Sequence, residues 1–144
     1  MTTDFSSLNL RAEIMQAITE LGYSEPTPIQ MGMIPLMLTG VDVVGQAQTG
    51  TGKTAAFALP ILHNFQRQKN PQALVLAPTR ELALQVADSM TEYGKHMHVR
   101  VLAVYGGQPY GPQINNLHRG VDIVVGTPGR LNDLLERKVL NLSE

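Results

Sequence analysis

Hydrophobic residues recur along the chain with two different spacings. Near the N-terminus, Ile14, Ala17, Ile18 and Leu21 recur every three or four positions, which is the spacing of one face of a helix. A glycine follows immediately and supplies a stop signal. The pattern therefore predicts a helix over residues 10–21.

Five further helices are expected from the same spacing and from helix-start residues. The clearest start is Thr27-Pro28-Ile29-Gln30, which has the residue types of a capping box and a proline at the first helical position. The five helices run from 28 to about 38, from near 52 to 65, from Thr79 to near 94, from 112 to 117, and from 128 to about 138.

Four short, continuous apolar stretches lie between these helices and are typical of buried strands. They cover residues 41–44, 73–77, 99–105 and 121–125. Strands that alternate with helices predict an α/β fold, with a mainly parallel sheet in a three-layer α/β/α arrangement. Residues 1–40 are expected to supply N-terminal helices to the same single domain whose core is residues 41–144. Because four strands make a small sheet, we expect the domain to be incomplete at its C-terminal side.

Composition excludes several classes of chemistry. The 144 residues contain no cysteine, which excludes disulfides, thiolate metal sites and cysteine nucleophiles. The net charge of −1 excludes a polycation that coats nucleic acid, although residues 53–144 are the more basic part. No secretory signal or apolar run of bilayer length is visible, so we expect a cytoplasmic protein without a membrane segment.

The strongest chemical signal is a glycine-rich loop between the first expected strand and the next helix. It follows the P-loop pattern G-x-x-x-x-G-K-[ST], except that alanine stands at the first glycine. Its glycines permit a tight turn that points N–H groups at phosphate, its lysine can reach the β- and γ-phosphates, and its last hydroxyl can ligate Mg²⁺. The loop therefore predicts a nucleoside triphosphate site and leaves the base open. It reads Ala47-Gln48-Thr49-Gly50-Thr51-Gly52-Lys53-Thr54.

Five segments stand in an order and spacing that together resemble one family. They are Gly22-Tyr23-Ser24-Glu25-Pro26-Thr27-Pro28-Ile29-Gln30 with Phe5 upstream, the loop 47–54, Pro78-Thr79-Arg80-Glu81-Leu82, Gly106-Gly107, and Thr127-Pro128-Gly129-Arg130. In this order they resemble the Q motif with its isolated aromatic residue, motif I, motif Ia, the GG element and motif Ib of DEAD-box RNA helicases. The bacterial, cold-shock-associated members are the most similar. Alanine at the first position of the loop is typical of this family.

The resemblance implies a RecA-like P-loop domain that binds ATP or ADP with Mg²⁺. Lys53 and Thr54 would serve catalysis by holding phosphate, and Thr54 would also ligate Mg²⁺. Gln30 would read adenine, with Phe5 and Tyr23 beside the base. The remaining nucleotide-binding residues would be Gln48, Thr49, Gly50, Thr51 and Gly52.

The same resemblance implies contacts with RNA backbone that do not depend on base sequence. These would come from Pro78, Thr79, Arg80, Gly106, Gly107, Thr127, Pro128, Gly129 and Arg130. The family's D-E-A-D and S-A-T motifs are not among the 144 residues. The full-length protein would thus be an ATP-dependent RNA helicase that unwinds short duplexes, whereas this chain alone would bind nucleotide weakly without turnover. The RNA, the pathway, the oligomeric state and any ribonucleoprotein or RNA-degradation partners do not follow from the sequence.

Purely structural interpretations exist beside these roles. Gln30 completes a capping box without any ligand, Arg80 can be a surface cation, Gly106-Gly107 can simply turn the chain, and Thr127 can be a plain helix cap. Two other functional classes also remain: a nucleotide- or RNA-binding module without catalysis, and an unrelated P-loop enzyme such as a small kinase.

Overall fold

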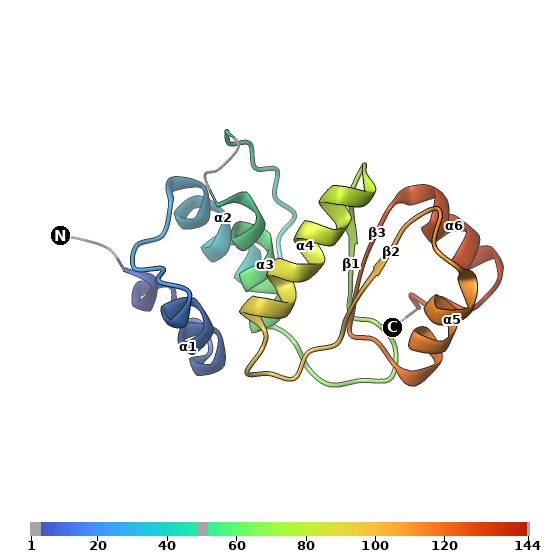
Figure 1. Cartoon of the computed structure of the whole chain (residues 1–144). Coiled ribbons are helices and arrows are strands. Elements are labelled where there is room, and N and C mark those ends of the chain that lie inside the picture. The colour runs from blue at the N-terminus through green and yellow to red at the C-terminus, as the bar shows by residue number, and fades with distance from the viewer. Residues whose placement is uncertain (1–3, 49–51, 144) are drawn as a thin grey trace. The chain divides into compact units, whose positions relative to one another are not determined.

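The computed structural model describes residues 4–48 and 52–143 (Figure 1). The chain divides into two compact units. The first unit contains the described residues up to Phe65 together with Glu92–His98, and the second contains Gln66–Thr91 together with the described residues from Val99 onward. The expectation of one domain with a boundary at residue 40 stays a prediction.

The first unit is built from helices. A short 3₁₀ helix, η1 (Phe5–Leu8), begins where the Asp4 carboxylate accepts a hydrogen bond from the Ser6 N–H at 3.0 Å. Three α-helices follow: α1 (Ala12–Glu20), α2 (Pro28–Leu38) and α3 (Lys53–His63). The α2 helix packs mainly on α3. The fully buried apolar side chains of these helices include Ile14, Ile18, Ile34, Leu59 and Leu62.

The second unit contains a parallel sheet of three strands. They are β1 (Ala73–Leu76), β2 (Val101–Val104) and β3 (Ile123–Gly126). The order is β1-β3-β2, so β3 lies in the middle and is buried along its whole length. The helices that join or follow the strands are α4 (Arg80–Tyr93), α5 (Tyr110–Arg119) and α6 (Pro128–Glu136).

Helices lie on both sides of this sheet. Figure 1 shows α5 and α6 on one side and α4 on the other. On the α5–α6 side, Val104 and Val124 form a buried core with Leu131 and Leu134 of α6. The predicted α/β fold with a parallel sheet is therefore confirmed, and β1, β2 and β3 correspond to three of the four expected strands.

The expected strand over residues 41–44 does not form, and this prediction was wrong. The segment has no regular secondary structure, and the side chains of Val41 and Val44 are 53% and 99% exposed. A strand is stabilised by pairing with a neighbour and by packing of its side chains, and β-branched residues favour it only in that setting. No strand of the described residues pairs with this segment.

The six expected helices are all present, with some shifts at their ends. The helix expected over 112–117 extends over Tyr110–Arg119, because Pro109 and Gly120 cap it on either side. Helix ends depend on such flanking contacts more than on apolar spacing.

Candidate functional site

Gln30 is a buried polar residue in the first turn of α2, with 3% of its surface exposed. Its carboxamide oxygen accepts a hydrogen bond from the Thr27 N–H at 2.9 Å, which is the glutamine half of the expected capping box. Its amide nitrogen donates to the Gly52 carbonyl oxygen at 3.2 Å. The side chain therefore joins the start of α2 to the last glycine of the phosphate loop.

Gly52 occupies a position that strongly favours glycine. It caps α3 in the left-handed region, with φ of 84°. A Cβ atom at this position would collide with the amide nitrogen of Gln30. Beside it, the buried Thr27 hydroxyl oxygen has no hydrogen-bond partner in the described part of the chain. The geometry of the loop's end is thus set jointly by residues 27, 30 and 52.

Lys53 and Thr54, the two side chains expected to hold phosphate, are the first two residues of α3. Lys53 is the first residue of this helix and is exposed, while Thr54 follows it and is half-buried. The N–H groups at the start of a helix and its partial positive charge favour an anion there. Gln48 is exposed. The predicted sites at Thr49, Gly50 and Thr51 lie outside the described residues.

Three aromatic rings of the first unit form a row. The Phe5 ring stacks on the Tyr23 ring with centroids 6.3 Å apart, and the Tyr23 ring tilts against the Tyr93 ring at 6.1 Å. The two tyrosine hydroxyls lie 3.2 Å apart. Burial, followed by the hydrogen bond to Tyr23, raises the pKa of the Tyr93 phenol. The sequence did not identify Tyr93 as part of this row, because the apolar spacing around it indicates only a helix.

Phe5 is only 2% exposed, because its ring is covered by protein on the sides that Tyr23 leaves open. Tyr23 is 40% exposed and is the accessible member of the row. Stacking of Phe5 on adenine stays a prediction.

The second unit gathers the three expected RNA motifs at one edge of its sheet. Residues 78–80 follow β1, residues 106–107 follow β2, and residues 127–130 follow β3. Because the strands are parallel, all three segments lie at their carboxyl ends. This edge is where open α/β sheets bind ligands.

Arg80 is an exposed cation at this edge. Its guanidinium lies 3.7 Å from the Glu81 carboxylate and 5.9 Å from the centre of the Tyr105 ring. The preceding Thr79 hydroxyl oxygen accepts a hydrogen bond from the Leu82 N–H at 3.2 Å and so caps α4, as expected. The Arg80 side chain is 59% exposed, so an anion from solvent can reach its guanidinium beside Glu81.

Arg130 has a different environment from the one that a surface cation would have. It is 9% exposed, and one of its guanidinium nitrogens donates to the Gln108 carbonyl oxygen and to the Gln113 side-chain oxygen, both at 3.0 Å. Its guanidinium also lies 4.0 Å from the centre of the Tyr110 ring. In this arrangement Arg130 holds the turn after Gly107, and direct contact with RNA phosphate stays a prediction.

The residues 127–129 are more open than Arg130. The Thr127 side chain makes no capping hydrogen bond, and its backbone N–H donates to the Val104 carbonyl oxygen at 3.0 Å. Pro128 and Gly129 are exposed, and no atom lies within 4 Å of where a Cβ of Gly129 would stand. The start of α6 therefore presents accessible backbone to a ligand.

Sequence reasoning missed a buried acid of the second unit that forms ion pairs with two arginines, Arg100 and, at 3.4 Å, Arg67. Asp122 is fully buried, and its carboxylate accepts hydrogen bonds from the Arg100 backbone N–H at 2.8 Å and from the Arg100 guanidinium at 2.9 and 3.2 Å. A charged residue inside the otherwise apolar stretch 121–125 was the available signal, because a buried carboxylate requires a partner.

No cluster of three or more histidine or acidic residues lies within metal-binding range in the described part of the chain. None of the helices in residues 4–48 and 52–143 has the length and apolarity needed to cross a bilayer.

Comparison with known proteins gives one consistent result. Residues 27–144 match the family model described as DEAD/DEAH box helicase. The chain is 58% identical to the ATP-dependent RNA helicase DeaD of Klebsiella pneumoniae, over 99% of this chain and 22% of that protein. It is 57% identical to the protein of the same name from Escherichia coli K12, over 99% of this chain and 23% of that protein. The chain thus spans less than a quarter of the length of these curated relatives.

Two solved structures are similar as well. A DEAD box protein from Methanococcus jannaschii matches with a TM-score of 0.91 and 44% identity, over 96% of this chain and 38% of that one. A hypothetical ATP-dependent RNA helicase from Sulfolobus tokodaii matches with a TM-score of 0.85 and 48% identity, over 93% of this chain and 39% of that one.

Proposed function

Because the chain belongs to the DEAD/DEAH box helicase family, we propose that it carries the ATP site and part of the RNA-binding surface of an ATP-dependent RNA helicase. The observation that carries this proposal is the hydrogen bond from the Gln30 amide to the Gly52 carbonyl oxygen at 3.2 Å. It joins a side chain suited to read a base to the loop suited to hold phosphate, as one nucleotide site requires.

The two hydrogen bonds of Gln30 fix the orientation of its carboxamide, and this orientation supports a role in adenine recognition. Its oxygen faces the Thr27 N–H and its amide faces the Gly52 carbonyl, so the two ends of the carboxamide cannot be exchanged without losing both bonds. A carboxamide oxygen has a second lone pair and its nitrogen a second N–H. These can accept from N6 and donate to N7 of adenine, whereas guanine presents an acceptor, O6, to the same oxygen.

Phosphate and Mg²⁺ would be held at the start of α3. Lys53 would contact the phosphates and the Thr54 hydroxyl would ligate Mg²⁺, and the metal would offset the phosphate charge during transfer. The exposed Lys53 makes no ion pair with any described residue, so its charge is available to a ligand.

RNA would bind at the carboxyl edge of the sheet in the second unit. Arg80 would supply a cation, and the open backbone of residues 127–129 would accept phosphate oxygens. Arg130 would act on RNA through the turn that it holds at Gln108. Contacts to phosphate carry no base information, so this surface would bind RNA without sequence preference.

A calorimetric titration with Mg·ADP and Mg·GDP tests the adenine site. We expect tighter binding of ADP, with discrimination that corresponds to about 1–3 kcal/mol for a bidentate base contact. Gln30→Ala should abolish the preference. Gln16→Ala, which removes an exposed glutamine of α1, should retain it.

Equal binding of both nucleotides by the unchanged chain would contradict adenine reading by Gln30. Binding of neither nucleotide would contradict the proposal that this chain carries a working nucleotide site.

A further inference from the structure

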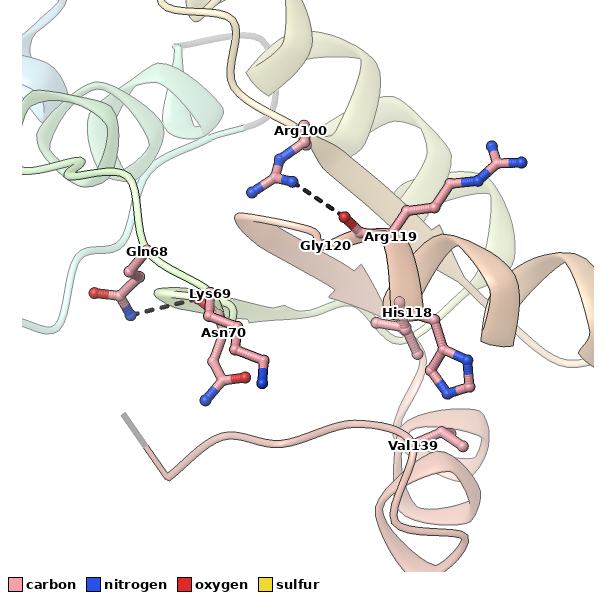
Figure 2. A pocket seen from close by; sticks show the side chains of 9 residues that line it. Gln68, Lys69, Asn70, Arg100, His118, Arg119, Gly120 and Val139 are labelled. Carbon is pink, nitrogen blue, oxygen red and sulfur yellow. Dashed lines mark hydrogen bonds between the residues drawn. The ribbon is translucent and has the colours of Figure 1, made fainter.

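A basic pocket lies at the opposite edge of the sheet from the expected RNA motifs. It has a volume of about 450 Å³ and lies within the second unit, where the chain enters the strands. Its walls come from the segment before β1, the residue before β2, the end of α5 and the residue Val139 after α6 (Figure 2). We call it the amino-edge pocket.

The charge of this pocket has one sign. Its lining includes the cations Lys69, Arg100 and Arg119 together with His118, and no aspartate or glutamate is among the described residues that line it. Lys69, His118 and Arg119 are exposed, and Lys69 makes no ion pair with a described residue. The fully buried Asp122 carboxylate offsets the charge of Arg100, so the excess positive charge comes from Lys69 and Arg119. A concave site with an excess of positive charge attracts anions.

Arg100 is held in place for such a role. The Asp122 carboxylate accepts from its Nε at 3.2 Å and from its Nη2 at 2.9 Å, which fixes the plane of the guanidinium. The same hydrogen bonds raise the pKa of Arg100. The remaining nitrogen, Nη1, donates to the Arg119 carbonyl oxygen at 3.4 Å, as Figure 2 shows. This hydrogen bond is long, and Nη1 has a second N–H that can donate to a ligand.

Gly120 makes room for this arginine. Its φ is 106°, and a Cβ atom there would stand 2.5 Å from the Arg100 Nη1. The carbonyl groups at the end of α5 would by themselves repel an anion. Arg100 offsets this effect because it lies against the Arg119 carbonyl, one of these terminal groups.

We propose that the amino-edge pocket binds a phosphate group, carried either by the backbone of an RNA strand or by a free phosphate compound. A fixed guanidinium with a flexible lysine beside it suits an oxyanion that accepts several hydrogen bonds. No phenylalanine, tyrosine or tryptophan is among the described lining residues, and the imidazole of His118 is the one ring among them. Since bases bind to proteins largely by stacking on aromatic side chains, the pocket suits the phosphate better than the base.

This inference does not rest on the proposed function. The adenine site belongs to the first unit, and the expected RNA motifs lie at the other edge of the sheet. Either proposal can fail while the other holds.

The Arg100 Nε–H group provides a local signal in a proton–nitrogen NMR spectrum, because its hydrogen bond to Asp122 slows exchange with water. We would titrate the full chain with a short oligouridylate and, separately, with inorganic phosphate, at constant ionic strength. A saturable shift of this signal is expected. Lys69→Ser combined with Arg119→Ser should weaken the apparent affinity by about fivefold or more, since two lining charges are lost.

Two variants serve as controls. Lys138→Asn removes a cation that does not line the pocket, at a position with φ of 60° that asparagine tolerates, and should leave the titration unchanged. Arg80→Ala removes the exposed cation of the carboxyl edge and should weaken RNA binding there without changing the Arg100 shift. The Arg100 signal also reports that the Asp122 pair is intact in each variant.

A shift with oligouridylate alone would assign the pocket to RNA backbone, and a shift with inorganic phosphate would assign it to free phosphate compounds. The proposal is overturned if neither ligand shifts the signal. It is equally overturned if the shift keeps its affinity in the doubly substituted chain.

Discussion

At the scale of single residues, the first unit depends on one carboxamide that accepts and donates at once. Gln30 ties the Thr27 N–H to the Gly52 carbonyl oxygen, and this places the last glycine of the loop directly against a buried side chain. The left-handed backbone at Gly52 and the lack of space for a Cβ atom are two consequences of this contact. A loop residue that looks adaptable in the sequence is therefore constrained by packing.

Gly52→Ala should lower the free energy of unfolding by about 1–3 kcal/mol, because a left-handed alanine is strained and its Cβ would displace Gln30. Gly32→Ala is the matched control, since this glycine lies inside α2 with open space around it. Alanine should stabilise that helix position by about 0.5–1 kcal/mol. Urea unfolding of both variants measures the difference, and equal stabilities would contradict the steric argument.

At the scale of elements, ion pairs stabilise the C-terminus of α1. Glu20 is the last residue of this helix, a place where the helix dipole disfavours an acid. The Lys95 ammonium at 2.6 Å and the His96 ring nitrogen at 3.0 Å, both just after α4, compensate for it. Hydrogen bonds to Lys95 and then to His96 lower the pKa of Glu20 to about 2.

This depressed pKa predicts a loss of stability in acid. Since the pKa of Glu20 is about 2 in the folded chain and 4.5 without these contacts, its stabilising effect is present above pH 4.5 and is lost as the pH falls toward 2. Glu20→Gln should therefore flatten the pH dependence of stability over this window. Urea unfolding at several pH values would measure it.

Glu25→Gln offers a control for the loss of one carboxyl group, because this exposed side chain forms no ion pair with a described residue. A Glu20→Gln profile identical to that of the unchanged chain would show that the Glu20 contacts contribute nothing.

At the scale of the whole molecule, the second unit presents two polar edges of one sheet. The carboxyl edge carries residues 78–80, 106–107 and 127–130, and the amino edge carries the basic pocket around Arg100. The first unit carries the loop 47–54 and Gln30. We propose that these parts hold a nucleotide and an RNA backbone. The D-E-A-D and S-A-T motifs of the family are not among the 144 residues.

We therefore predict that the 144-residue chain binds nucleotide without catalytic turnover. Phosphoryl transfer requires a carboxylate that holds Mg²⁺ and a group that positions the attacking water, and the family's residues for both belong to the missing motifs. A steady-state ATPase assay with and without oligouridylate should give the same background rate for the unchanged chain and for Lys53→Ala. RNA-stimulated turnover that disappears in Lys53→Ala would contradict this prediction.

Local signals explain why much of the fold could be predicted. Apolar spacing and caps act within a few residues, so the helices and three of the strands were found at nearly the right places. The prediction of a strand over residues 41–44 was wrong because a strand also needs a neighbouring strand to pair with, and β-branched residues favour a strand only in that setting.

The sequence alone determined the order of the motifs and the α/β class, because both follow from patterns along the chain. The phosphate site expected at the loop 47–54 stays a prediction. Tertiary structure decided which polar groups are already engaged. Arg130 bonds to a residue 22 positions away, and Arg100 bonds to Asp122 across the same separation. Buried charges must find partners wherever the fold brings them, so only the folded chain distinguishes a cation that holds a turn from a cation that is open to a ligand.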